Sequence, residues 1–285
     1  MNLQNIISEI EKVDPEIYER TSTRRDAFKG FAGVSGKIAL TALPFAFGSM
    51  IQKAYGSPQN ATAVLDVLNF ALKLEYLEYH FYNKGINTAL ISTAAVGPGL
   101  TALTTIRNHE GDHVTFLKNA ILAAGGVPVS FVESDFDFTA DGTFPTVFLS
   151  YDTFLAVAQA LEDTGVRAYK GQAGNLIGAA NRTVLTAALN IHSVEARHAS
   201  HIRQMRKARG ADVKPWITGN DTGGIGASVN GNYAGEQNVI QVVGSNNITI
   251  TGINGFSISA NAATEAFDEP LTEAEVTTLV TPFFA

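Results

Sequence analysis

The sequence predicts an all-α protein whose main body is a bundle of four long helices, followed by a C-terminal extension of different character. Three observations favour this fold class. Four segments place their apolar side chains at helical intervals, one connection is much longer than the other two, and a set of polar residues is repeated in both halves of the helical region. Together they indicate two similar helical hairpins joined by a crossover.

The composition describes a globular protein and excludes several classes of function. The chain has 285 residues, of which 45% are apolar and 16% charged, enough for one core of about 150 residues with appendages. Its net charge of −7, with no basic stripe to offset it, argues against nucleic acid as a partner. There is no cysteine, which excludes disulfides, iron–sulfur centres and thiol catalysis. Any bound metal must therefore be held by histidine and carboxylate.

The four helices are expected at 62–84, 100–124, 151–172 and 181–209. At 1.5 Å per residue each would span roughly 30–40 Å, which is the length of a bundle helix. Asn60 is a candidate N-cap of the first helix. Glycines follow three of the helices, at Gly85, Gly125 and Gly210, where the absence of a side chain favours helix termination.

The lengths of the connections predict the topology. About 15 residues join the first helix to the second, and about eight join the third to the fourth, so each pair forms an antiparallel hairpin. Residues 126–150 separate the second helix from the third. Extended chain covers about 3.3 Å per residue, so this connection can cross the whole length of the bundle.

The C-terminal extension changes in composition beyond Gly210. Residues 217–256 are rich in Gly, Asn, Thr, Val and Ile and contain short alternating stretches that predict strands. Thr272 and Glu275 have the spacing of a capping box, which predicts a short terminal helix. The extension is expected to cover the bundle or to pair with a neighbouring copy, so a homo-oligomer is one expectation.

Near the N-terminus, residues 22–29 read Ser-Thr-Arg-Arg-Asp-Ala-Phe-Lys and precede a mildly apolar run at 31–51. This pattern resembles a twin-arginine export signal. Small residues at Ala54 and Gly56 fit cleavage before Ser57. The alternative is a membrane-anchoring or amphipathic helix that is never removed.

The resemblance implies an export signal at 1–56, followed by the bundle at 57–210 and the extension at 211–285. It also implies a periplasmic or other extracytoplasmic location. Several glycines and Pro44 make the apolar run a poor membrane span. No stable membrane span is therefore expected after cleavage.

Polar residues recur on otherwise apolar faces of the two hairpins. The first and third helices each carry one glutamate, and the second and fourth each carry Glu-x-x-His, which gives Glu75, Glu110, His113, Glu162, Glu195 and His198. Glu75 and Glu110 are 35 residues apart, and Glu162 and Glu195 are 33 apart. A Glu and a His three positions apart lie on one helix face. Four buried carboxylates would repel each other unless two divalent cations neutralised them, so the pattern predicts a two-metal site.

This arrangement over residues 61–209 resembles the ferritin-like superfamily, in which bacterioferritins, rubrerythrins and manganese catalases share such a ligand set. It is most similar to exported bacterial ferritin-like proteins related to desiccation-induced ones. The resemblance implies a ferritin-like four-helix bundle with the long crossover between helices two and three. Glu75 and Glu162 would be terminal carboxylates, Glu110 and Glu195 would bridge the metals, and one histidine would cap each metal.

Tyr82 and Tyr169 each follow their glutamate by seven residues and share its helix face. One interpretation is an ordinary core tyrosine. The other is that each hydroxyl donates a hydrogen bond to a ligating carboxylate, with each hairpin presenting its tyrosine to the glutamate of the other.

Other polar residues near the motifs lack a repeated partner. Glu78 corresponds to Gly165 in the second hairpin and is expected at the surface. His192 corresponds to Arg107 and is expected beside the site or at the surface. Three further histidines are expected to be solvated: His80, His109 and His201.

Carboxylate oxygens with one imidazole per metal suit two divalent ions of iron or manganese. The leading hypothesis is an oxidoreductase acting on ferrous iron, oxygen or peroxide, either a ferroxidase or a manganese-catalase-like enzyme. Two alternatives remain. One is a non-catalytic envelope or stress protein with a structural metal site, and the other is a binding module that uses its C-terminal extension.

Overall fold

Four long helices form the core of the computed structural model, which describes residues 58–95, 97–177 and 182–285. These helices are α4 (Pro58–Asn87), α6 (Pro98–Ala123), α7 (Tyr151–Ala173) and α8 (Arg182–Ala208). The prediction of a mostly helical protein is confirmed, with the long helices within a few residues of their expected positions. The expected export signal lies outside the described residues. Within those residues, no helix is both long and apolar enough to cross a membrane.

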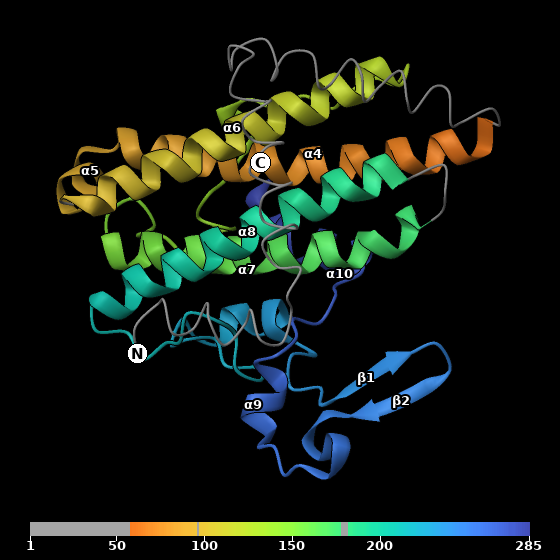
Figure 1. Ribbon diagram of the computed structural model, residues 1–285. Helices are drawn as coiled ribbons and strands as arrows, with labels where there is room; N and C mark the ends of the chain where they lie inside the picture. The colour runs from red at the N-terminus through yellow and green to blue at the C-terminus, as the bar shows by residue number, and fades with distance from the viewer. Residues whose placement is uncertain (1–57, 96, 178–181) are drawn as a thin grey trace, which may run out of the picture. The chain divides into compact units, whose positions relative to one another are not determined.

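The long helices contact one another mainly in two pairs, α4 with α6 and α7 with α8. Within each pair the helices run in opposite directions (Figure 1). A short helix, α5 (Ala89–Ala94), lies in the first connection. Ser150 caps α7 by accepting a hydrogen bond from the backbone N–H of Thr153, and Gly125, at a φ of 80°, follows the end of α6.

Two expectations about the first helix are wrong. α4 begins at Pro58, so Asn60 lies inside the helix, and it continues past Gly85 to Asn87. Gly85 instead allows a close approach. A Cβ atom there would lie 2.3 Å from the ring of Phe154, which is buried against α4. The glycine is therefore explained by helix packing rather than by helix termination.

The long connection between α6 and α7 returns along the helices and is held by aromatic side chains. It contains one 3₁₀ turn, η1 (Glu133–Asp135). Phe138 and Phe148 from this segment pack on Phe81 of α4, with ring centroids 5.8 and 5.9 Å apart. Phe81 in turn stacks on Phe154 of α7 at 4.8 Å. Aromatic burial of this kind fixes the path of a segment that has almost no regular structure.

The extension contains short elements, as the sequence predicted. Strands β1 (Ile240–Val243) and β2 (Asn246–Thr249) pair antiparallel, with Ile240 opposite Thr249. The extension also contains η4 (Ala227–Tyr233), η5 (Ile250–Gly255), α9 (Ala260–Thr264), α10 (Glu273–Val280) and η6 (Thr281–Phe283), whereas η2 (Gly174–Leu176) lies in the connection between α7 and α8. The capping box of Thr272 and Glu275 at the start of α10 is confirmed.

Buried charges hold the extension against α7. Residues 157–169 of this helix are buried without interruption, so α7 is covered on every side. Arg167 is 1% exposed. Its guanidinium lies 2.7 Å from a carboxylate oxygen of Glu236 and donates hydrogen bonds to three backbone carbonyls of the extension. Tyr233 donates to Asp163 at 2.8 Å, and Asp163 also pairs with Arg203.

Removing one partner of the Arg167–Glu236 pair should destabilise the protein strongly. Glu236→Ala would leave a buried guanidinium without its counter-charge, so we expect the free energy of unfolding to fall by about 3 kcal/mol or more. Urea denaturation followed by circular dichroism measures this loss. The control is Glu133→Ala, which breaks a surface pair with Lys84 in which both side chains are more than 40% exposed, and which should change stability by about 0–1 kcal/mol. Equal effects of the two substitutions would contradict a buried electrostatic anchor.

Candidate metal centre

The four long helices bring all six residues of the repeated motif to one place. Each helix contributes one glutamate, and all four glutamates are fully buried. The ligand atoms form two sets, each of which gathers within 4.8 Å: Glu75, Glu110, His113 and Glu195 in the first, and Glu110, Glu162, Glu195 and His198 in the second. We call these sets the His113 quartet and the His198 quartet. They are buried clusters of the kind that could bind metal ions.

In the His113 quartet, three carboxylates surround one imidazole nitrogen. His113 Nδ1 lies 3.0 Å from Glu75 Oε2, 3.0 Å from Glu110 Oε2 and 3.2 Å from Glu195 Oε1. A glutamate from each of three helices therefore points towards the same position as the histidine.

The His198 quartet repeats this arrangement around the histidine of the other hairpin. His198 Nδ1 lies 2.8 Å from Glu110 Oε1, 3.5 Å from Glu162 Oε2 and 3.9 Å from Glu195 Oε2. Glu110 and Glu195 thus belong to both quartets and present one oxygen atom to each histidine. Glu75 and Glu162 each belong to one quartet.

The pattern of unpaired atoms fits a divalent cation best in the His198 quartet, because His113 Nδ1 already has hydrogen-bond partners in Glu75 and Glu110. Within the described chain, Glu110 Oε1, both oxygens of Glu195 and His198 Nδ1 are buried and have no aligned hydrogen-bond partner, although His198 Nδ1 and Glu110 Oε1 are only 2.8 Å apart. Buried polar atoms are rarely left in this way. Two ligand atoms about 2.1 Å from one cation, at right angles, are about 3.0 Å apart. The crowded, unbonded atoms therefore have the spacing that ligands of a shared cation require.

Two buried tyrosines each donate a hydrogen bond to one carboxylate oxygen of a glutamate. Tyr82 donates to Glu162 Oε1 at 2.6 Å, and Tyr169 donates to Glu75 Oε1. Each hairpin thus supplies a tyrosine to the glutamate of the other, as the repeat predicted. Burial, followed by the charge of the neighbouring glutamate, raises the pKa of both phenols well above the ordinary value, so they stay neutral donors. The second oxygen of each carboxylate remains directed at its quartet.

The electrostatics of the cluster reflect a competition between burial and charge. Burial alone would lower the pKa of His113 and of His198, but the surrounding carboxylates outweigh it and raise both pKa values far above 6.5. Burial raises the pKa of Glu162 to about 7, against the opposing effect of His198. For Glu195 the two histidines outweigh burial and lower the pKa to about 2. Without cations, the cluster therefore relies on protons to reduce its negative charge.

The expectation that Glu78 lies at the surface is wrong. Glu78 is 4% exposed, and its side chain faces Gly165. A Cβ atom at Gly165 would be 3.3 Å from Glu78 Oε1 and 3.6 Å from Glu195 Oε2. Burial and the charges of Glu195 and Glu162 raise the pKa of Glu78 well above its usual range. The glycine opposite makes room for this carboxyl group, which belongs to neither quartet.

Sequence reasoning also missed the role of His109. Its ring is exposed, as expected, but it is not simply solvated. His109 Nδ1 lies 2.9 Å from His198 Nε2, and the two rings stack with centroids 5.2 Å apart. The position beside Glu110 on α6 was a signal for this contact, but His109 has no counterpart in the second hairpin and the repeat could not reveal it.

The other histidines have ordinary structural positions. His80 packs among aromatic rings and donates to the carbonyl of Phe131 at 3.3 Å, so it is not solvated as expected. His192 donates to the carbonyl of Val166 at 3.0 Å, beside the helix pair. His201 is exposed and lies in a surface groove of about 510 Å³ between α6 and α8. The groove is also lined by His109, Arg197 and His198.

Comparison with known proteins agrees with this geometry. Residues 63–208 match the family model described as a ferritin-like domain. No curated protein and no solved structure gave a significant match to the chain.

The metal-free protein should lose stability as the pH rises from about 5 to 8. The folded-state pKa of Glu162, about 7, exceeds its unfolded value, so the folded state holds a proton that the unfolded chain releases from about pH 4.5 upwards. The stability that protonated His113 and His198 contribute is complete below about pH 6.5 and is lost above it. The loss expected from Glu162 alone is on the order of 3 kcal/mol, and urea unfolding of chelator-treated protein measures the total. Glu162→Gln should flatten part of the slope, and a stability that rises over this range would contradict the buried cluster.

His109→Phe should weaken one metal position and leave the other unchanged. Phenylalanine keeps a ring on His198 but removes the nitrogen that fixes the tautomer and orientation of that histidine. We expect a loss of about 10–100-fold in affinity at the His198 quartet. Calorimetric metal titration measures both affinities, and His201→Phe in the same groove is the matched control. Unchanged binding at both quartets would show that His109 has no positioning role.

Proposed function

The chain belongs to the ferritin-like domain family, and on that premise we propose that it is a di-metal carboxylate protein holding iron or manganese. We propose further that it is an oxidoreductase acting on ferrous iron, oxygen or peroxide. The observation that carries this proposal is the pair of quartets that share Glu110 and Glu195. Hard oxygen ligands with one imidazole each suit iron and manganese better than copper or zinc.

The geometry of the oxygens supports a separate role for each pair of glutamates. Glu110 and Glu195 would be shared by the two ions, since each directs one oxygen to each histidine. Glu75 and Glu162 would each hold one ion, because their Oε1 atoms accept hydrogen bonds from the tyrosines and their Oε2 atoms are directed at the histidines of their quartets. The four carboxylates balance the charge of two divalent cations.

A bound metal pair would supply the change in oxidation state that the side chains cannot. The chain contributes rigid placement: each ligand stands on a long helix, and the tyrosines fix the terminal carboxylates. Glu78 is a carboxyl group within the buried cluster that can hold a proton beside Glu195. The histidine edge of the His198 quartet lies at the surface groove, which gives small polar molecules a route towards it.

We also propose the detailed architecture of the protein and its location in the cell. Residues 57–210 would form the ferritin-like four-helix bundle with its long crossover, and 211–285 the extension that covers it. The segment 1–56 would direct export by the twin-arginine route to the periplasm or another extracytoplasmic compartment. Self-association through the extension into a homo-oligomer fits its exposed apolar residues Val242, Val243 and Phe256.

Substitution of a bridging glutamate should disturb both metal positions, whereas substitution of a terminal one should disturb only its own. Wild-type protein is expected to bind two ions. Glu195→Ala should weaken both by at least about 10-fold, and Glu75→Ala should weaken only the ion of the His113 quartet. Metal titration with elemental analysis measures the stoichiometry. Glu273→Ala, at an exposed position on α10, is the control. A loss confined to one ion in Glu195→Ala would contradict a shared bridge.

Turnover separates catalysis from a structural role for the metals. The protein loaded with iron should consume oxygen in the presence of ferrous iron, or the protein loaded with manganese should release oxygen from hydrogen peroxide. Whichever activity the wild-type protein shows should disappear in Glu195→Ala and persist in Glu273→Ala. Two tightly bound ions without either activity would indicate the non-catalytic metal protein instead.

A further inference from the structure

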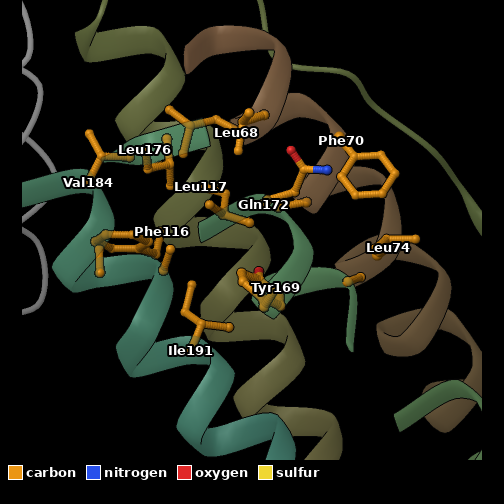
Figure 2. A pocket seen from close by; sticks show the side chains of 15 residues that line it. Leu68, Phe70, Leu74, Phe116, Leu117, Tyr169, Gln172, Leu176, Val184 and Ile191 are labelled. Carbon is orange, nitrogen blue, oxygen red and sulfur yellow. The ribbon is translucent and has the colours of Figure 1, made fainter. Parts of the chain in front are cut away.

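A small apolar cavity lies among the four long helices, close to the metal quartets but separate from them. Figure 2 shows residues of all four helices around it, including Leu68, Leu117, Tyr169 and Ile191. The volume of the cavity is about 20 Å³. About 10–15 Å³ holds one water molecule, so the cavity has room for a very small molecule.

On three of the helices, a residue that lines the cavity stands about one helical turn from a quartet residue. Ala71 on α4 precedes Glu75 by four residues, Leu117 on α6 follows His113 by four, and Ile191 on α8 precedes Glu195 by four. These offsets point the same way because α6 runs opposite to α4 and α8 (Figure 1). Four residues correspond to about 6 Å along a helix.

Tyr169 connects the cavity to the metal site. Its ring lines the cavity, and its hydroxyl donates to Glu75 Oε1 in the His113 quartet. A molecule in the cavity would therefore lie next to a residue that contacts a proposed ligand.

The walls of the cavity select for an apolar occupant. Only two polar side chains line it, Tyr169 and Gln172. The hydroxyl of Tyr169 is engaged by Glu75, and the side-chain carbonyl of Gln172 accepts a hydrogen bond from Asn175, which leaves the amide nitrogen of Gln172 as a single further donor. A buried water typically needs two to four polar partners, and apolar cavities without them stay dry and bind apolar gases. Hydrogen peroxide has the same need for partners as water.

We propose that this cavity is a binding site for dioxygen, held one turn from the metal pair. The inference rests on the proposed function and refines it, because it favours oxygen over peroxide as the oxidant that enters through the bundle. Peroxide would enter instead by the surface groove beside His198, where imidazole and guanidinium groups supply polar contacts.

Noble-gas binding tests the site without reference to activity. Crystals of the metal-loaded protein are pressurised with krypton or xenon, and we expect an anomalous peak between Ala71, Leu117 and Ile191. Ala71→Leu fills the cavity with three further carbon atoms and should abolish the peak. If that variant does not fold, Leu117→Phe serves the same purpose. The absence of a peak in wild-type crystals would overturn the proposal.

Oxygen dependence provides the second measurement. In ferrous iron oxidation, Ala71→Leu should raise KM for oxygen by about 5-fold or more, while still binding two metal ions and turning over peroxide at the wild-type rate. Ala123→Leu, the same change at the end of α6 and outside the cavity, should leave KM for oxygen unchanged. If Ala102→Leu in the surface groove raises KM for oxygen and Ala71→Leu does not, oxygen enters through the groove and the proposal fails.

The two hypotheses fail in different ways. A gas peak in a protein that binds no metal would remove the proposed function and leave an apolar gas site. Two bound metals with oxygen turnover, but no gas peak and no change in KM in Ala71→Leu, would leave the proposed function and remove the oxygen site.

Discussion

Mutual repulsion among four buried carboxylates is the constraint on which the rest of this structure depends. Glu75, Glu110, Glu162 and Glu195 are fully buried, and their oxygens gather within a few ångströms in two overlapping quartets. Isolated, such a group would favour unfolding, since ionised carboxylates are strongly destabilised away from water. Positive charge must be supplied at the centre, by protonated imidazoles or by cations. The surrounding helices must also be stable enough to hold the group together when that charge is lacking.

The surrounding chain meets this constraint by rigid packing on both faces of α7. Towards the core, this helix carries Glu162 and Tyr169 to the quartets. On its outer face, Asp163 and Arg167 are buried under the extension and are paired there. The extension therefore does more than cover apolar surface. It completes the environment of a helix whose charged residues face both the metal site and the C-terminal segment.

The helical region and the six motif residues could be predicted because each rests on a local pattern. Apolar periodicity fixes helices, and Glu-x-x-His places two ligands on one face regardless of what lies opposite. Glu78 and His109 could not be predicted, because their environment depends on residues from other helices. Glu78 is buried because Gly165 leaves space for it, and His109 matters because His198 lies beside it. The cavity is likewise a property of four helices at once, and no single segment of sequence encodes it.

The contacts between Tyr82 and Glu162, and between Tyr169 and Glu75, are those that a two-fold symmetric pair of identical hairpins would form. Glu78 and Gly165 break that symmetry. Two identical hairpins would carry the same residue at this position in both copies. Two glutamates would crowd each other with two further carboxyl groups in the cluster, and two glycines would leave an empty space. Joining the hairpins in one chain frees the two positions to differ, so that one half can supply a carboxyl group and the other the room for it.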